Sequence, residues 1–342
     1  MDDFIMQNIL NENIEDLEPP SRRTGNPLTE LPEKQFIKLF RVNKRLFNYI
    51  VSLVEPYMRP KRISTDLAVN TRVLAALRFY AGGSYQADVG YNAYIGVSQQ
   101  SVSRSVREVT EALNRPEILN TVIKFPRNFQ ELHTKRIQFY NDFGFAGVIG
   151  CIDCTHIAIV PPPKNNPLLP ERAFVNRKGF HSINCQLICD SRLKIMNVVA
   201  SYPGSIHDSF IWNNSPVQDI LRGIHQTGNL DFFLLGDSGY PLRSWLLTPV
   251  QPEPQENTSE YRFNIQHQRV RSLVERCNGL LKGRFRCCLK DRVLHYRPEV
   301  AGKIINACVV LHNLCIENNI PPPEDLEEIN IRDGTEVTRI SL

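Results

Sequence analysis

The chain has 342 residues, of which 42% are apolar and 22% charged, which is typical of a soluble globular protein with one or two domains. No apolar run reaches the ~18 residues of a membrane span, and the acidic N-terminus lacks the basic start of a secretory signal, so we expect neither membrane insertion nor export. The nine cysteines are then expected to be reduced thiols in the cytosol or the nucleus.

The net charge of +4 conceals a basic middle between two acidic ends. Residues 1–34 hold eight acids and three bases, and residues 321–342 hold six acids and two bases. The remaining residues hold 35 bases against 22 acids, which favours a polyanionic partner such as nucleic acid. An ordinary solvated basic surface has the same composition, so charge alone leaves both interpretations open.

The first part of the chain is predicted to be helical after a flexible leader. Residues 1–31 are acidic and polar, as in a flexible segment, and residues 32–115 repeat apolar side chains at helical spacing. We predict that Asp66 caps a helix that ends at Gly83. A short helix is expected to follow over residues 85–90.

The segment IGVSQQSVSRSVREVTEAL is similar to the turn and second helix of a helix-turn-helix. Ser98 can cap a helix over residues 99–113, whose buried stripe would be Val102, Val106, Val109 and Leu113. Its early positions would present polar donors to the major groove of DNA, namely Gln99, Gln100 and Arg104. Any surface helix of a three-helix bundle shows this pattern, so a purely architectural role is the alternative.

The rest of the chain alternates strand and helix patterns, which predicts an α/β fold. Residues 116–145 are expected to form a connector, and residues 146–318 a sheet covered by helices. The predicted strands cover 147–160, 181–190, 194–203 and 232–237, and the predicted helices cover 128–140, 242–247, 266–282 and 298–317. The acidic tail 319–342 is predicted to be disordered.

Two carboxylates stand at positions that suit a metal centre. Cleavage of a phosphodiester by two metal ions needs acids that converge from separate chain segments. Asp153 lies in an apolar strand, where a charge requires a metal or an ion pair, and Asp237 ends a strand, where ligands of α/β sheets gather. The respective alternatives are a salt-bridged core aspartate and a cap of the turn at Ser238 and Gly239.

Two further acids have an equally open interpretation. Glu275 lies at the edge of an apolar helical seam, within residues 262–292, which hold nine bases and two acids. It suits metal binding next to a phosphate backbone, and it equally suits a helical ion pair with Arg271. Asp208 is a fourth candidate ligand, for which capping of a short helix is a sufficient explanation.

Together these motifs resemble a known family. The segments CIDCTHIAI, SYPGSIHDSF, LLGDSGYPLRSWLLTP and VERCNGLLKGRFRCC, followed by ACVVLHN, are similar to the PIF/Harbinger transposases and their domesticated nuclease relatives over about residues 145–320. The resemblance implies an RNase H-like nuclease core with a DDE triad, in which the metal ligands are Asp153, Asp237 and Glu275 with Asp208. Cys154 departs from the usual glycine, and Cys277 with Asn278 replaces a pair that contains an aromatic residue.

We therefore predict a transposase-like endonuclease that hydrolyses DNA phosphodiester bonds with two Mg²⁺ or Mn²⁺ ions. Arg271, Lys282 and Arg284 are predicted to contact DNA phosphates. The resemblance also implies a Myb/SANT-like partner protein for DNA recognition and nuclear import. We expect location in the nucleus with a cytoplasmic pool, and a homo-oligomer is a further expectation. The alternative is a catalytically silent, domesticated protein that acts as a DNA-binding or adaptor protein.

Other chemistries find less support in the sequence. Cys151 and Cys154 have the spacing of a zinc pair, but no second pair follows, and on a strand their side chains would point to opposite faces. The adjacent Cys287 and Cys288, like Cys308, are expected to pack in the core. The sequence contains neither a phosphate-binding glycine loop nor a serine-nucleophile motif.

Overall fold

The computed structural model describes residues 25–64, 66–83, 85–164, 170–228 and 231–326. Most of the predicted leader, 1–24, and most of the predicted tail, 327–342, therefore lie outside the described residues. The chain forms two compact units, which are built from interleaved segments. The first comprises residues 1–122, 157–164 and 281–326, and the second comprises residues 123–156, 165–280 and 327–342.

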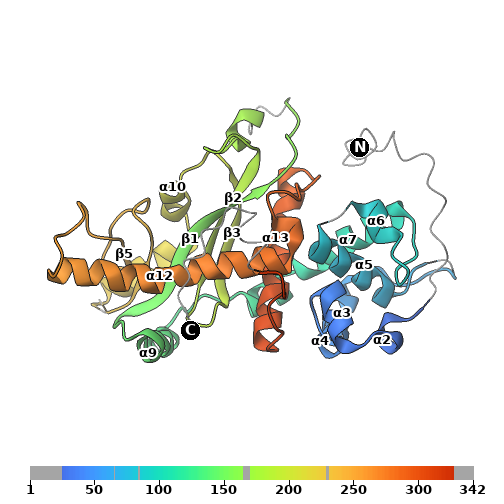
Figure 1. Cartoon of the computed structure of the whole chain (residues 1–342), viewed down its shortest axis with the longest axis horizontal. Coiled ribbons are helices and arrows are strands. Elements are labelled where there is room, and N and C mark those ends of the chain that lie inside the picture. Colours follow the sequence, from blue (N-terminus) through green and yellow to red (C-terminus); the bar gives the residue numbers. More distant parts are fainter. Residues whose placement is uncertain (1–24, 65, 84, 165–169, 229–230, 327–342) are drawn as a thin grey trace. The chain divides into compact units, whose positions relative to one another are not determined.

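The described part of the first unit is helical (Figure 1). Its α-helices are α2 (Pro27–Glu30), α3 (Glu33–Phe40), α4 (Lys44–Val54), α5 (Val69–Gly82), α6 (Gln86–Gly90), α7 (Gln99–Leu113), α8 (Pro116–Val122) and α13 (Pro298–Glu317), and its short 3-10 helices are η1 (Glu55–Tyr57) and η3 (Arg286–Cys288). Helix α7 has the predicted bounds and the predicted cap, since the Ser98 side chain accepts a hydrogen bond from the Ser101 N–H. The predicted apolar stripe of α7 is buried.

The predicted cap of α5 is wrong, although its end is confirmed. The helix begins after Ala68 without a side-chain cap, because the Asp66 carboxylate already accepts from the N–H groups of Arg62 and Ile63. At the other end Gly83 has a φ of 60°, a left-handed conformation that favours glycine. A Cβ there would also lie 2.9 Å from the backbone of Arg286, so the position excludes larger residues.

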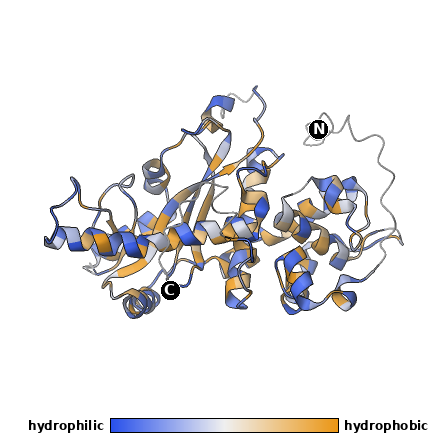
Figure 2. Ribbon diagram, viewed as in Figure 1, coloured by the Kyte–Doolittle hydropathy of each residue, from blue (hydrophilic) through white to orange (hydrophobic). Residues whose placement is uncertain are grey.

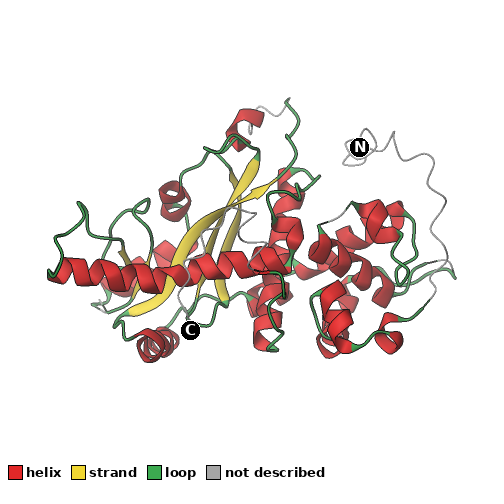
Figure 3. Ribbon diagram, in the orientation of Figure 1, coloured by secondary structure: helices red, strands yellow, loops and turns green. Residues whose placement is uncertain are grey.

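The second unit contains a five-stranded mixed sheet (Figure 3). The strands are β1 (Val148–Ala158), β2 (Ser182–Cys189), β3 (Ile195–Pro203), β4 (Phe233–Leu235) and β5 (Leu246–Leu247), in the order β3-β2-β1-β4-β5. Strands β2 and β3 form the predicted antiparallel hairpin, whereas β4 is parallel to both β1 and β5. The helical elements are α9 (Phe129–Phe143), α10 (Asp208–Asn213), α11 (Pro216–Gln226) and α12 (Ser259–Arg284), with the 3-10 helix η2 (Glu171–Phe174).

The helix predicted over residues 242–247 is wrong, because this segment adds the strand β5 to the sheet. The N–H of Leu234 donates to the carbonyl of Trp245, and the N–H of Gly236 donates to the carbonyl of Leu247. The apolar run is too short for a stable helix, and strand β4 offers it backbone partners. Sheet pairing is a long-range interaction that local spacing does not encode.

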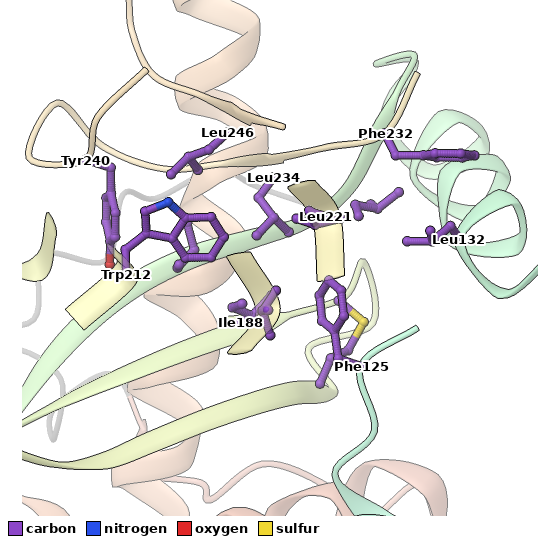
Figure 4. Packing of buried hydrophobic residues seen from close by; sticks show 13 residues of the cluster. Phe125, Leu132, Ile188, Trp212, Leu221, Phe232, Leu234, Tyr240 and Leu246 are labelled. Carbon is purple, nitrogen blue, oxygen red and sulfur yellow. The ribbon is translucent and has the colours of Figure 1, made fainter. Parts of the chain in front are cut away.

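The two faces of β1 meet different partners. On one face Cys151 Sγ donates to the Val270 carbonyl of α12, which lies over β1 in Figure 1. On the other face Cys154 Sγ lies 3.3 Å from the Tyr240 hydroxyl, beside the hydrophobic cluster of Figure 4. That cluster includes Leu132 of α9, Trp212 of α10, Val217 and Leu221 of α11, and Leu234 and Leu246 of the sheet. Because side chains alternate along a strand, Asp153 faces α12 together with Cys151.

Helix α12 is mostly hydrophilic, whereas α13 is mostly hydrophobic (Figure 2). By length and composition alone α13 could cross a membrane, but 72% of its apolar window is buried inside the structure, as in a core helix. The packed chain also extends beyond the predicted limits of 32 and 318. Leu31 is 6% exposed and Ile320 is 5% exposed.

Candidate active site

The carboxylate of Asp153 lies between β1 and two residues of α12. Asn278 donates from Nδ2 to Asp153 Oδ2 over 3.1 Å, and Arg271 Nη1 lies 3.9 Å from Asp153 Oδ1. The Asp153 side chain is 18% exposed. The alternative of a salt-bridged aspartate is therefore observed, with the arginine placed at the rim of the site.

Asp237 lies next to Asp153 because β1 and β4 are parallel neighbours. In the register of this pair Cys151 lies opposite Leu235, so the aspartates two residues further on emerge at the same end of the two strands. This is the edge at which α/β sheets collect ligands. One oxygen of Asp237, Oδ1, also accepts from the Gly239 N–H over 2.9 Å, so the predicted turn cap is present as well.

Asp208 is the first residue of α10, and the prediction that it caps this helix is wrong. The N-cap position belongs to His207, which makes no side-chain cap. Asp208 Oδ1 instead accepts from Asn184 Nδ2 over 2.8 Å. The same Asn184 amide donates to the Ile206 carbonyl, so this strand residue orients both the turn and the carboxylate.

Glu275 lies on the stripe of α12 that faces Asp153. Arg271, Glu275 and Asn278 are spaced by four and three residues, which places them on one side of the helix. Arg271 Nη2 forms an ion pair with Glu275 Oε1, so the predicted alternative of a helical ion pair is observed. The guanidinium of Arg271 thus contacts Glu275 and also lies near Asp153.

The electrostatics of Asp153 show that the four acids share one site. Burial raises the pKa of Asp153 to about 7, Arg271 opposes the rise, and the charges of Asp237, Asp208 and Glu275 add to it. Neighbouring negative charges disfavour the ionised form of Asp153, and a bound cation would favour it. Yet no three of these carboxylates offer oxygens that all lie within 4.8 Å of one another, among the residues that the structure describes.

Sequence reasoning missed the two amides that orient these acids. In the sequence Asn278 stands out only in the pair that departs from the family pattern, and Asn184 stands within the apolar pattern of the strand HSINCQLICD. Both are almost completely buried, at 3% and 1% exposure. A polar side chain inside an apolar strand or seam was the available signal, because buried amides are retained where they have a partner.

Two of the predicted DNA contacts are wrong. Lys282 is 6% exposed and Arg284 is 1% exposed, so neither presents its charge at a surface. Arg284 Nη2 donates to the Ile320 carbonyl over 3.0 Å, which shows that the end of α12 is covered by the segment after α13. The prediction assumed that the basic side of this helix faces solvent, and at the end of α12 it does not.

The predicted DNA-reading residues of α7 lie at accessible positions in its first two turns. Gln100 and Arg104 are exposed, and Gln99 is partly exposed. Arg104 also borders a cavity of about 350 Å³ that is lined by Arg59 and Lys61 among other residues. These side chains form a basic surface beside the start of α7.

Three cysteines of the first unit form a separate cluster. Cys287 Sγ lies 3.9 Å from Cys288 Sγ and 3.6 Å from Cys308 Sγ. All three are buried, and burial raises the pKa of the Cys287 and Cys308 thiols well above the usual value. Their burial agrees with the prediction that they pack in the core, although their three sulfurs also lie close enough together to form a possible metal-ligand group.

The comparisons with known proteins agree with this description. A family model described as DDE superfamily endonuclease matches residues 152–313. The chain is 35% identical to nuclease HARBI1 of Homo sapiens over 322 residues, which is 90% of this chain and 88% of the human one. It is 38% identical to nuclease HARBI1 of Mus musculus over 296 residues, which cover 86% and 80% of the two chains.

A plant relative is more distant. The Protein ALP1-like of Arabidopsis thaliana is 28% identical over 303 residues, or 83% of this chain and 71% of that protein. No solved structure matches the chain. The family match and the mixed α/β sheet define a domain of the DDE endonuclease type. The chain belongs to the Harbinger transposase-derived nucleases, the family of the HARBI1 proteins, which confirms the predicted resemblance.

Proposed function

We propose that this protein is a DNA endonuclease that hydrolyses phosphodiester bonds with two divalent metal ions, Mg²⁺ or Mn²⁺. The observation that carries this proposal is the parallel register of β1 and β4, which brings Asp153 and Asp237 to one sheet edge. The strand order β3-β2-β1-β4-β5, with a helix over β1, further supports the RNase H-like interpretation of the fold.

The residues of this edge fit hard divalent cations. All the candidate ligands are carboxylate oxygens, which such cations prefer. Asp153, Asp237 and Glu275 would hold the ions, and Asp208 would assist. When bound, the ions activate the attacking water and stabilise the leaving oxygen. Asn278 and Asn184 orient two of the carboxylates through the hydrogen bonds described above.

DNA binding is proposed to involve two surfaces. The exposed start of α7, with Gln99, Gln100 and Arg104, suits a helix-turn-helix-like contact in a groove. Arg271 suits a phosphate near the acids. On the family resemblance we also propose a Myb/SANT-like partner, nuclear location with a cytoplasmic pool, and self-association.

A nicking assay tests the catalytic proposal. Purified protein with Mn²⁺ is incubated with supercoiled plasmid, and the nicked product is quantified for the native chain and for Asp153→Asn and Glu275→Gln. Glu260→Gln, which changes an exposed acid at the start of α12, is the matched control. Equal nicking by all four proteins would exclude these acids as catalytic ligands, whereas nicking that only Glu260→Gln retains would support them.

The second candidate is a catalytically silent adaptor. It is favoured by one observation, the ion pair of Glu275 with Arg271 in a site whose carboxylates are not closely converged. A silent adaptor would bind DNA or its partner in a salt-dependent way that survives loss of every acid. Metal-dependent nicking by the native protein would remove this candidate.

A further inference from the structure

The guanidinium of Arg271 lies beside two of the proposed metal ligands, Glu275 and Asp153. Its Nη2 forms an ion pair with Glu275 Oε1, and its Nη1 is 3.9 Å from Asp153 Oδ1. The three side chains are 20%, 23% and 18% exposed, so solvent screens this arrangement only partly. A divalent ion bound by the same acids would face a positive charge in close proximity.

We propose that Arg271 is a switch that couples metal binding to DNA binding. Without DNA it neutralises Glu275 and Asp153 and so weakens the binding of metal ions. A DNA phosphate draws the guanidinium away from the acids, and Glu275 then becomes available as a ligand. This inference rests on the proposed metal-dependent nuclease function and adds a regulation of that site.

The chemistry of arginine favours a phosphate as the competing partner. The planar guanidinium matches a phosphate with two parallel hydrogen bonds, as it matches a carboxylate. The ion pair that Arg271 loses is therefore replaced by an interaction of the same kind.

The position of Arg271 on α12 makes the exchange a local movement. Arg271 and Glu275 are one helical turn apart, so a rotation of the arginine side chain is sufficient to separate them. Asn278 continues to hold Asp153 through its own hydrogen bond. The backbone of the site therefore need not move when the switch operates.

Coupling of this kind is reciprocal, which makes it measurable from either ligand. If DNA strengthens metal binding, the metal must strengthen DNA binding by the same factor. The coupling is expected to amount to about tenfold, within the usual range for linked sites. It should be reduced when Arg271, the side chain that connects the two ligands, is removed.

The experiment measures metal binding rather than cleavage. Mn²⁺ dissociation constants of the full-length protein without DNA are obtained from the electron paramagnetic resonance signal of the free ion. Arg271→Gln is expected to bind Mn²⁺ about tenfold more tightly than the native chain. Arg269→Gln, an exposed arginine two residues away on another side of the helix, is the matched control and should bind Mn²⁺ like the native chain.

A second measurement follows the coupling. The affinity for a labelled 20-bp duplex is measured by fluorescence anisotropy with and without Ca²⁺, an oxygen-binding cation used in place of the catalytic one. Ca²⁺ should strengthen binding to the native chain and to Arg269→Gln, and should have a clearly smaller effect on Arg271→Gln. Arg271→Lys keeps the charge without the planar fork and is expected to lie between the two.

The outcomes separate this inference from the proposed function. If the native chain binds Mn²⁺ and Arg271→Gln binds it equally or more weakly, the switch is refuted and the metal centre stands. The same holds if Arg271→Gln retains the full effect of Ca²⁺ on DNA binding. If neither the native chain nor any variant binds Mn²⁺, the proposed metal centre itself fails, and the switch fails with it.

Discussion

The acids of the second unit and the cysteines of the first unit are two contrasting groups of metal-ligand side chains. The sulfurs of Cys287, Cys288 and Cys308 lie close together, yet burial keeps the Cys287 and Cys308 thiols neutral. The carboxylates lie further apart, yet two buried amides donate hydrogen bonds to Asp208 and Asp153, and an arginine forms an ion pair with Glu275. The two groups therefore differ in what surrounds their ligand atoms, and the metal centre proposed above lies in the group whose side chains have polar partners.

The largest expected effect concerns a carboxylate at the sheet edge. Asp237→Asn should reduce Mn²⁺-dependent nicking by roughly 1,000-fold, because bound metal contributes several kcal/mol of transition-state stabilisation. Nicking is measured on supercoiled plasmid per mole of folded protein. A loss below about tenfold would place Asp237 outside the metal centre and leave it as a turn cap.

The next effect is a pH dependence of the metal-free protein. The pKa of Asp153 is about 7 in the folded chain, against 3.8 for an ordinary aspartate, so the folded state binds the proton more tightly. Stability should therefore fall as the pH rises from about 4 to about 7. Above that range Asp153→Asn should be more stable than the native chain by about 2–4 kcal/mol, because it carries no buried charge.

Urea denaturation in EDTA at pH 5 and pH 8 checks this expectation. The two proteins should differ less at pH 5 than at pH 8, because the loss of stability begins near the unfolded pKa of about 4 and is complete only above the folded pKa of about 7. Equal stability at both pH values would show that Arg271 fully neutralises the carboxylate. Added Mn²⁺ should stabilise the native chain and leave Asp153→Asn unchanged.

A smaller effect concerns the amide that orients Asp153. Asn278→Ala removes the hydrogen bond to Asp153 Oδ2 and should weaken Mn²⁺ binding by about 10–100-fold, as is typical for partners of metal ligands. The measurement is a Mn²⁺ titration, with Glu260→Gln as control. Unchanged affinity would mean that the strand alone orients the carboxylate.

The smallest expected effect tests the cysteine cluster. Cys308→Ala removes one buried sulfur and should lower the free energy of unfolding by about 1 kcal/mol through lost packing. Its Mn²⁺ affinity should stay within about twofold of the native value, because neutral core thiols take no part in the metal centre. A larger change in Mn²⁺ affinity would mean that the cysteines contribute to Mn²⁺ binding, as the carboxylates are proposed to do.

The sequence predicted the elements whose signals are local. The Ser98 cap and its apolar stripe are sufficient to define α7, and the bounds of α13 also agree with the prediction. Two predicted helix caps failed, one through neighbouring backbone groups and one through a partner in another element. Asp66 and Asp208 do not cap their helices, because other backbone and amide groups engage their oxygens.

The acids themselves were predictable from the sequence, because a carboxylate at a strand end or on a basic helix is a local signal. Only the tertiary structure decided their arrangement. The register of β1 with β4 places Asp153 beside Asp237, and the packing of α12 brings Arg271 and Asn278 to them while it buries Lys282 and Arg284. Residue spacing encodes which side of an element a group occupies, whereas the partner on that side depends on chain segments far away in the sequence.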